Sequence, residues 1–462
     1  MSESQIVEAA APPRPAEDDG LPVGRRRLAL TALYSALVLV VVDGAVVNVA
    51  LPTIGQALRV GSAASVAVAT SYQLAVVISL LPFAALGESI GPRRVFVAGA
   101  ALFIAASGLC AASPTLAVLI AARFLQGLGG GAIMALAAML LRFTMPKDRL
   151  AHAIGWNAVA VALAGAAGPS VGALILSVAS WPWLFAVNLP IGALALAAAR
   201  ALPAVPGSGH RVDAISAAAS AGLFTLFFVG AGRIAEAPLL GSALILAAAL
   251  CLIGLIRRER GHAAPLVPID LFTERAFRRT VLASGATFCA QMMSGIALPF
   301  HLQRALGADV LSTGLYMSAW PIAIVSSASF SGRLAGRAPA SVLCAVGTSV
   351  LALALLLSGL APTAAGVAPI LALMALAGLG FGVFQPANNR LLLLSAPKAR
   401  SGAAGGVQAT TRLVGQTFGA TMMTALFQLA PGDVAPRLGL VAAAGFALTA
   451  AIIGAVNARH VE

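Results

Sequence analysis

Charged side chains are scarce in this sequence, which excludes an ordinary water-soluble domain. Only 10% of the 462 residues are charged and 60% are hydrophobic, whereas about a quarter of the residues of a soluble domain carry a charge. Long apolar runs recur from end to end, as in proteins whose helices cross a membrane many times. Alternating strand patterns are lacking, which argues against an outer-membrane barrel. We therefore expect an all-α polytopic membrane protein.

The signatures of disulfides, metal sites and enzymes are also lacking. The four cysteines have no CxxC spacing and lie inside apolar runs, where we expect them to be small packing residues. No HExxH, GxSxG or phosphate-loop string is present. The sequence thus predicts no catalysis, no metal and no cofactor. The missing phosphate-loop string also indicates that this chain does not obtain energy from ATP hydrolysis.

Positive charge is concentrated in the connections between the apolar runs. The net charge is +13, and the Lys and Arg residues lie mostly in every second connection. This is the pattern that orients helices with their basic loops in the cytoplasm, and it does not predict a nucleic-acid-binding face. Because the number of runs is even, we expect both termini to be cytoplasmic.

Fourteen spans are expected, as two blocks of six with an extra helix pair between them. The parts are a disordered cytoplasmic N-terminus (1–27), a six-helix bundle (28–201), a linker with the central pair (202–256), a basic cytoplasmic loop (257–279), a second six-helix bundle (280–458) and a tail (459–462). The predicted spans are residues 28–51, 64–86, 94–112, 115–141, 150–177, 181–201, 214–232, 238–256, 280–300, 310–330, 340–360, 367–394, 402–429 and 438–458.

The two blocks of six resemble each other as a diverged repeat. Gly127-Leu-Gly129-x-Gly131 matches Gly378-Leu-Gly380-x-Gly382 at a spacing of 251 residues, and Gly168 matches Gly419 at the same spacing. Duplicated helix bundles around a site at the middle of the membrane are the architecture of many secondary transporters.

Asp43 is the one acidic residue inside a predicted span. A charge at that depth costs about 2.5–3.5 kcal/mol on insertion scales, so it is usually retained for function. Burial disfavours the charged form of a carboxyl group, which suits a residue that binds and releases protons. The alternative is a permanently protonated, hydrogen-bonded Asp43 that orders helix packing.

Four motifs, in the expected order, resemble those of the fourteen-span drug:proton antiporters of the major facilitator superfamily. Asp43-Gly-Ala-Val-Val-Asn48-Val-Ala-Leu-Pro52 resembles the first-span signature, and Arg123-Phe-Leu-Gln126-Gly127 the span 4 motif. The other two are the loop motif Leu86-Gly-Glu88-Ser-Ile-Gly91-Pro-Arg93-Arg94 and the span 5 antiporter motif Gly165-Ala-Ala-Gly168-Pro169-Ser-Val-Gly172. The resemblance implies a major facilitator fold of fourteen spans in a bacterial inner membrane.

The resemblance also implies roles for individual residues. Arg123 would tune proton release by Asp43; the alternative is an arginine that extends to the membrane surface. Glu88, which stands where the family has Asp, would latch the halves together by reaching the helix N-terminus at Ser401-Gly402. Gly91, Arg93 and Arg94 complete that gating loop; the alternative is a simple basic turn.

The span 5 motif predicts a tight helix contact. Pro169 removes a backbone hydrogen bond and should kink the helix, while Gly168 and Gly172 allow a neighbour to approach closely. Such a contact could seal the pore or serve packing alone.

Six polar or flexible side chains are candidates for a substrate cavity. Arg412, well inside its span, could balance an anionic substrate or donate to backbone carbonyls, and methionines suit varied ligands. The candidates are Asn48, Gln126, Asn157, Gln291, Met292 and Arg412.

The sequence therefore predicts a proton-coupled exporter of small lipophilic or cationic compounds that works by alternating access. Its partners would be the substrate, protons and the lipid bilayer, and we expect a monomer. The alternatives are an uptake symporter of a small metabolite with the same fold, and a membrane scaffold or sensor that transports nothing.

Overall fold

A computed structural model describes residues 20–207, 213–234, 236–259, 269–334, 338–362, 366–395, 401–430, 432 and 434–459, and this part of the chain is helical with short connections. The α-helices are α1 (Val23–Ala57), α2 (Ser62–Ile90), α3 (Pro92–Ala111), α4 (Leu116–Thr144), α5 (Lys147–Val178), α6 (Trp183–Ala186), α7 (Asn188–Ala198), α8 (Ala214–Arg233), α9 (Pro238–Glu259), α10 (Arg275–Phe300), α11 (Val310–Met317), α12 (Ala319–Leu334), α13 (Ala340–Leu360), α14 (Val367–Leu394), α15 (Ser401–Leu429) and α16 (Val434–Ala458). Short 3₁₀ turns (Ala199–Ala201 and Ile269–Thr273) and one π turn (His301–Ala305) complete the set.

Twelve helical segments of the described chain are long and apolar enough to cross a membrane. They do not include α5 and α15, although these helices have 32 and 29 residues. Helix α15 is less apolar than its neighbours because it carries Gln408, Arg412 and Gln416. The all-α polytopic fold is thus confirmed, whereas the count of fourteen spans stays a prediction.

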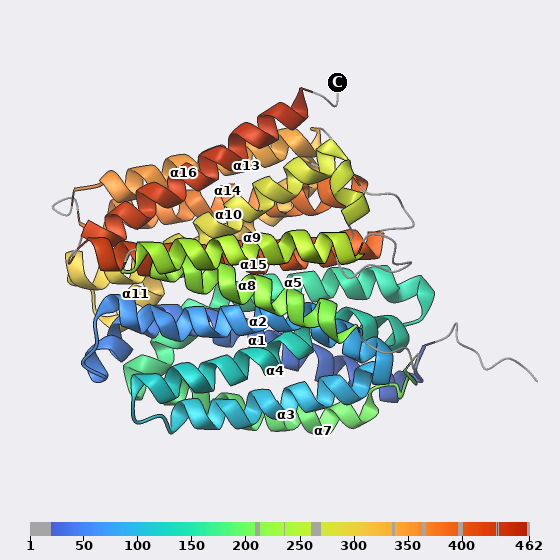
Figure 1. The fold of residues 1–462 in the computed structure, drawn as a ribbon. Coiled ribbons are helices and arrows are strands. Elements are labelled where there is room, and N and C mark those ends of the chain that lie inside the picture. Colours follow the sequence, from blue (N-terminus) through green and yellow to red (C-terminus); the bar gives the residue numbers. More distant parts are fainter. Residues whose placement is uncertain are drawn as a thin grey trace, which may run out of the picture.

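The helices form two blocks that lie one above the other in Figure 1. Helices α1–α4 and α7 make up the lower block, and α10, α13, α14 and α16 the upper one. Helices α8 and α9 pack against each other, and α8 also touches α2 of the first block and α15 of the second. The extra pair therefore lies against the junction of the two blocks.

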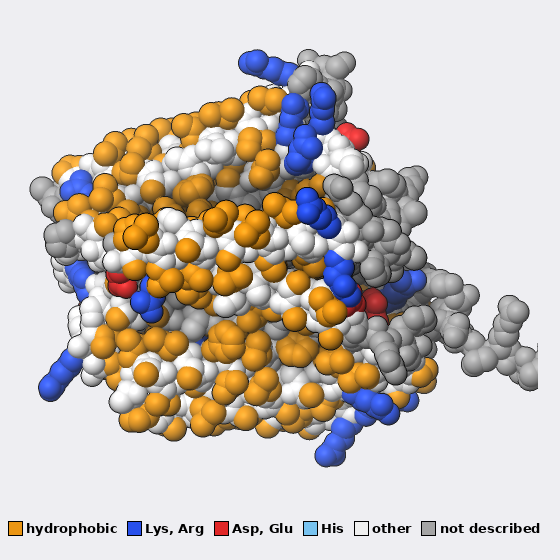
Figure 2. Space-filling view, viewed as in Figure 1, with side chains coloured by type: hydrophobic (Ala, Val, Ile, Leu, Met, Phe, Trp, Pro, Cys, Tyr) orange, Lys and Arg blue, Asp and Glu red, His pale blue; other side chains and the backbone are white. Residues whose placement is uncertain are grey.

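Basic side chains gather at one end of the bundle. Figure 2 shows most of the visible Lys and Arg side chains at the end where the chain terminates, and hydrophobic side chains along the length of the bundle. The N-terminal helix α1 also begins at this end (Figure 1). This arrangement agrees with the charge pattern of the sequence, and the cytoplasmic placement of the termini stays a prediction.

Matching glycines make matching contacts in the two blocks. A Cβ at Gly127 of α4 would lie 2.4 Å from the Tyr72 carbonyl oxygen of α2, and one at Gly378 of α14 would lie 2.3 Å from the Trp320 carbonyl oxygen of α12. Only glycine permits such close helix approach. The repeat read from the sequence therefore corresponds to two equivalent helix packings.

Two of the expected spans are broken helices. The span at 181–201 is divided into α6 and α7, and the span at 310–330 into α11 and α12. Pro190 and Pro321 follow these breaks by two or three residues, and each lacks the N–H that would bond one turn back. The break at Val187 places Asn188 at the start of α7.

The N-terminal region differs from its prediction. Helix α1 begins at Val23, so residues 23–27, expected to be disordered, are helical. The Arg25 guanidinium donates to the carbonyls of Ala201 and Leu202, which ties this first turn to the end of the block. Residues 1–19 lie outside the described part of the chain. The expected loop is also shorter, since α9 reaches Glu259 and α10 starts at Arg275.

Candidate functional site

The carboxylate of Asp43 lies in the interior of the first helix block. This α1 residue is 2% exposed. Its Oδ2 accepts a hydrogen bond from Arg123 Nη1 at 2.5 Å, and its Oδ1 accepts from Gln126 Nε2 at 3.0 Å and from Asn188 Nδ2 at 2.6 Å. A counter-ion and hydrogen-bond donors of this kind are what a buried carboxylate requires. The roles of Asp43 as a proton carrier and as a protonated packing residue both stay predictions.

Arg123 of α4 is fully buried and does not extend to the surface of the bundle. Its Nε donates to the Val68 carbonyl of α2 at 3.2 Å. The guanidinium carbon lies 4.1 Å from the centre of the Tyr72 ring and 5.5 Å from that of Phe185, both within range of a cation–π contact. The ion pair thus ties α1 and α4 to the faces of α2 and α6.

Ser107 of α3 and Asn188 of α7 complete this group. Gln126 Nε2 also donates to Ser107 Oγ at 2.8 Å, and Asn188 Nδ2 lies 3.4 Å from the same oxygen. Sequence reasoning missed both residues; the available signal was a polar side chain within an apolar run. We call Asp43, Ser107, Arg123, Gln126 and Asn188 the Asp43 cluster, which connects α1, α3, α4 and α7.

A cavity of about 210 Å³ lies between the two blocks. One wall comes from α1, α2, α4 and α5, and the other from α10, α11, α12, α14 and α15. Its lining is largely apolar, and Arg412 is the charged residue among the described ones that line it. The other lining groups able to form side-chain hydrogen bonds include Asn48, Tyr72, Gln73, Gln291, Ser294, Trp320, Gln385 and Gln416.

The Asp43 cluster adjoins this cavity without opening into it. Asp43 is not among the lining residues, whereas its neighbours Val40 and Gly44 are. Tyr72 belongs to both sites: its ring covers the Arg123 guanidinium and also lines the cavity. The Tyr72 hydroxyl donates to the Val40 carbonyl at 2.9 Å, which fixes the ring between them.

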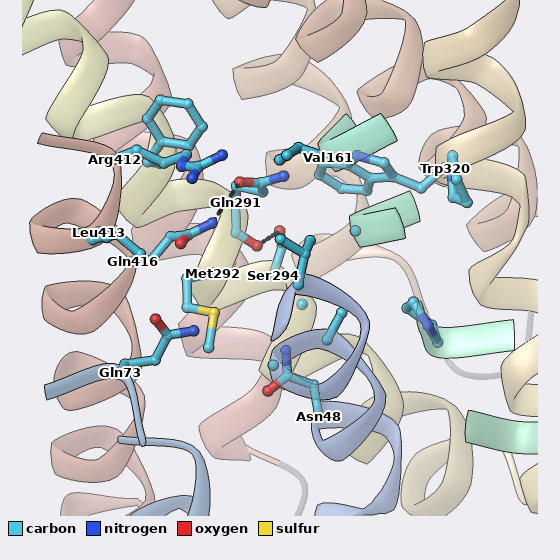
Figure 3. Close-up of a pocket in the computed structure, with 18 of the residues that line it drawn as sticks. Asn48, Gln73, Val161, Gln291, Met292, Ser294, Trp320, Arg412, Leu413 and Gln416 are labelled. Carbon is cyan, nitrogen blue, oxygen red and sulfur yellow. Dashed lines mark hydrogen bonds between the residues drawn. The ribbon is translucent and has the colours of Figure 1, made fainter. Parts of the chain in front are cut away.

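Four of the six predicted cavity residues line the cavity: Asn48, Gln291, Met292 and Arg412. Figure 3 shows them around a common space together with Gln73, Trp320 and Gln416, which the sequence did not single out. Gln126 was wrongly placed there, because its amide is taken up by the Asp43 cluster. Asn157 does not line it either; it lies four residues, about 6 Å along α5, before Val161, the first α5 residue of the lining.

The span 5 motif places α5 against both blocks. A Cβ at Gly168 would lie 2.4 Å from the Ala45 Cβ of α1, and one at Gly172 would lie 3.0 Å from the Val46 carbonyl oxygen. On the other side, the Ser170 and Ser318 hydroxyls are 2.5 Å apart, which connects α5 to the junction of α11 and α12. Gly165 and Pro169 line the cavity. The motif thus lies at the contact of the two blocks beside Asp43.

The gating loop does not show the predicted latch. The Glu88 side chain is exposed, and it makes no hydrogen bond or ion pair with a described residue. The side chains of Ser401 and Gly402 lie outside the described part, so this contact stays a prediction. Arg93 donates instead to the Arg200 carbonyl at 3.0 Å, and Arg94 is exposed. Gly91 has φ +104°, a conformation that favours glycine in the turn before α3.

Comparisons with known proteins agree with this architecture. The chain is 39% identical over 448 residues to the uncharacterized transporter YebQ of Escherichia coli, which covers 95% of this chain and 97% of YebQ. It is 27% identical to the tetracenomycin C resistance and export protein of Streptomyces glaucescens, over 89% of this chain and 78% of that protein. The crystal structure of a POT family transporter in complex with 5-aminolevulinic acid has the same fold, with a TM-score of 0.70, 15% identity, and coverage of 95% and 97%.

A family model covers most of the chain as well. The Major Facilitator Superfamily model matches residues 33–420, which include the Asp43 cluster and all the lining of the cavity. With a match of this length, a close relative over almost the whole sequence and two helix blocks around one cavity, the chain belongs to the Major Facilitator Superfamily of membrane transporters.

Proposed function

We propose that this transporter is a proton-coupled exporter of small, largely apolar compounds. The observation that carries the proposal is the buried Asp43–Arg123 ion pair, which shares Tyr72 with the cavity between the blocks. Such a costly buried pair is usually kept for function in a membrane. The export direction is supported by the span 5 motif and by the similarity to an export protein.

Protonation of Asp43 would neutralise the carboxylate and leave Arg123 without its counter-ion. The guanidinium, the Tyr72 ring and the α1 backbone at Val40 would then have to rearrange, because each contacts the next. Tyr72 and Val40 belong to one wall of the cavity. Proton binding would thereby favour one orientation of the blocks, and substrate binding with proton release would favour the other.

Cationic substrates, which the sequence analysis includes in its prediction, fit this cavity poorly. Among the described lining residues there is no carboxylate, and the charged group present is the guanidinium of Arg412. A cation would be repelled inside a cavity of low dielectric.

The test uses a bacterial strain that lacks its own efflux pumps. Expression of the protein should raise resistance to a panel of lipophilic antibacterial compounds and should produce efflux that an uncoupler abolishes. Asp43→Asn should remove both effects because asparagine cannot exchange a proton. Glu274→Gln, an exposed position at the start of α10, is the matched control and should keep them.

Two results would contradict the proposal. Equal pH-driven transport by the wild type and Asp43→Asn would remove the coupling role of this residue. Accumulation of substrate in right-side-out membrane vesicles but not in inverted ones would show an uptake symporter.

A further inference from the structure

Arg412 differs from the other arginine of the membrane interior in having no partner among the described residues. It lies on α15, within a helix that packs against α10 and α2. Its Nε is shielded from solvent and has no hydrogen-bond partner, and the guanidinium forms no ion pair with a described residue. Arg123, by contrast, contacts a carboxylate, an amide, a carbonyl and an aromatic ring, although its Nη2 also has no hydrogen-bond partner among the described residues. The backbone-carbonyl role considered for Arg412 is therefore not observed.

An unpaired guanidinium in this position makes the cavity electropositive. The acidic residue of the predicted spans, Asp43, is already paired with Arg123 on the far side of α1. No carboxylate lines the cavity among the described residues, so nothing there balances Arg412. Low-dielectric walls strengthen the potential of one charge, which raises the local concentration of anions.

Two amide side chains extend the polar end of the cavity. Gln416 Nε2 donates to Gln291 Oε1 at 3.5 Å, which leaves the NH₂ group of Gln291 without a partner among the described residues. Figure 3 shows the Arg412 guanidinium pointing toward Gln291, with Gln416 beside them. A planar guanidinium with an adjacent amide donor matches the oxygens of a carboxylate or sulfonate.

Apolar and aromatic side chains form the rest of the wall. Phe288, Met292, Trp320 and Phe381 line it from α10, α12 and α14. A ligand that satisfies both parts has one anionic group at Arg412 and an apolar, preferably aromatic, body against these rings.

We propose that this cavity binds amphiphilic organic anions, with Arg412 as counter-ion of a single carboxylate or sulfonate. The inference rests on the proposed function only in placing the substrate in this cavity. Anion binding at Arg412 can be correct even if the protein imports its substrate or if Asp43 does not carry the proton.

The test measures binding to the purified full-length protein in detergent, where no gradient is needed. The probes are 8-anilino-1-naphthalenesulfonate and N-phenyl-1-naphthylamine, which share a ring system and differ by the sulfonate. Displaceable fluorescence would be titrated for the wild type, Arg412→Gln, Arg412→Lys, Arg304→Gln and Asp43→Asn. Arg304, which lies outside the cavity lining, supplies the matched loss of one arginine.

The expected result is a loss confined to the anionic probe. Arg412→Gln should weaken sulfonate binding by about 10-fold or more, as for loss of a charge-assisted hydrogen bond, and leave the neutral probe unchanged. Arg412→Lys should retain part of the affinity, because it keeps the charge without the planar fork. Arg304→Gln should bind both probes as the wild type does. Asp43→Asn should still bind the sulfonate more tightly than the neutral probe, because it keeps Arg412.

If the variants fail to fold, the affinities of the wild type for the two probes still test the proposal. Equal displaceable affinity for the two probes would overturn the proposal, as would unchanged sulfonate binding by a folded Arg412→Gln protein. The two proposals can be separated with Asp43→Asn. Loss of transport by this variant would support proton coupling by Asp43, and a retained preference for the sulfonate over the neutral probe would support the anion site at Arg412.

Discussion

At the scale of single residues, Arg123 and Arg412 differ in whether a counter-ion balances their charge. Arg123 is fully buried and its charge is balanced by Asp43 at 2.5 Å. Arg412 lies at a cavity wall and its charge is not balanced by any described side chain. A buried charge without a counter-ion costs several kcal/mol, so the paired arginine supports the fold, whereas the arginine without a counter-ion is available to a ligand.

The Asp43–Arg123 pair should therefore show strong coupling in a double-mutant cycle. Arg123→Leu leaves the Asp43 carboxylate buried and unpaired, and should lower the free energy of unfolding by about 3–5 kcal/mol. Adding Asp43→Asn should recover part of that loss, because the asparagine amide is neutral and leaves no buried charge unpaired. Thermal unfolding in detergent measures both, with Arg304→Leu as the control; strictly additive losses would argue against a coupled pair.

At the scale of helices, α5 holds the structure together where the blocks meet. It packs on α1 through Gly168 and Gly172, and it reaches the second block through Ser170 and Ser318. A Cβ at Gly314 of α11 would overlap the Ala173 side chain, so this second contact is equally close. The position of α5 relative to Asp43 thus depends on glycines, which have no side chain to separate the helices.

Gly168→Ala and Gly165→Ala should have different effects on stability. The added methyl at residue 168 would lie 2.4 Å from the Ala45 Cβ, whereas at residue 165 the nearest atom, Val41 Cγ1, is 3.6 Å away. Overpacking of this kind costs about 1–3 kcal/mol, so Gly168→Ala should unfold at lower temperature and transport more slowly. Gly165→Ala should unfold at the wild-type temperature; equal unfolding temperatures of the two variants would show that the α1–α5 contact is not tight.

At the scale of the whole molecule, the proposed proton site and the proposed substrate cavity are adjacent but separate. The Asp43 cluster lies within the first block, and the cavity lies between the blocks. Proton and substrate therefore need not compete for one side chain. Their coupling would pass through α1 and Tyr72, which belong to both sites.

Exchange of one proton for one organic anion should be strongly electrogenic. The inward proton and the outward anion move charge in the same sense, so each cycle transfers two charges, worth about 4.6 kcal/mol per 100 mV. Proteoliposomes with potassium gradients and valinomycin would measure substrate gradients at imposed potentials. The logarithm of the gradient should depend twice as steeply on potential for an anionic as for a neutral substrate; an equal dependence would contradict transport of the anion in its charged form.

The sequence by itself determined which residues are unusual. A carboxylate at 43 and arginines at 123 and 412 stand out inside apolar runs because a bilayer penalises each of them. The repeated glycines likewise identify faces where helices approach closely, and the matching contacts of Gly127 and Gly378 agree with that inference.

Only the tertiary structure decided which of those faces meet. Asn188 lies 145 residues from Asp43, and nothing in helical periodicity connects them. Gln126 shares a face with Arg123, so the sequence could not tell whether it joined the ion pair or the cavity. Helical spacing determines which side chains point the same way, but the rotation of each helix and the choice of its neighbours come from packing among all of them. That packing gave Arg123 a counter-ion and left Arg412 open to the cavity.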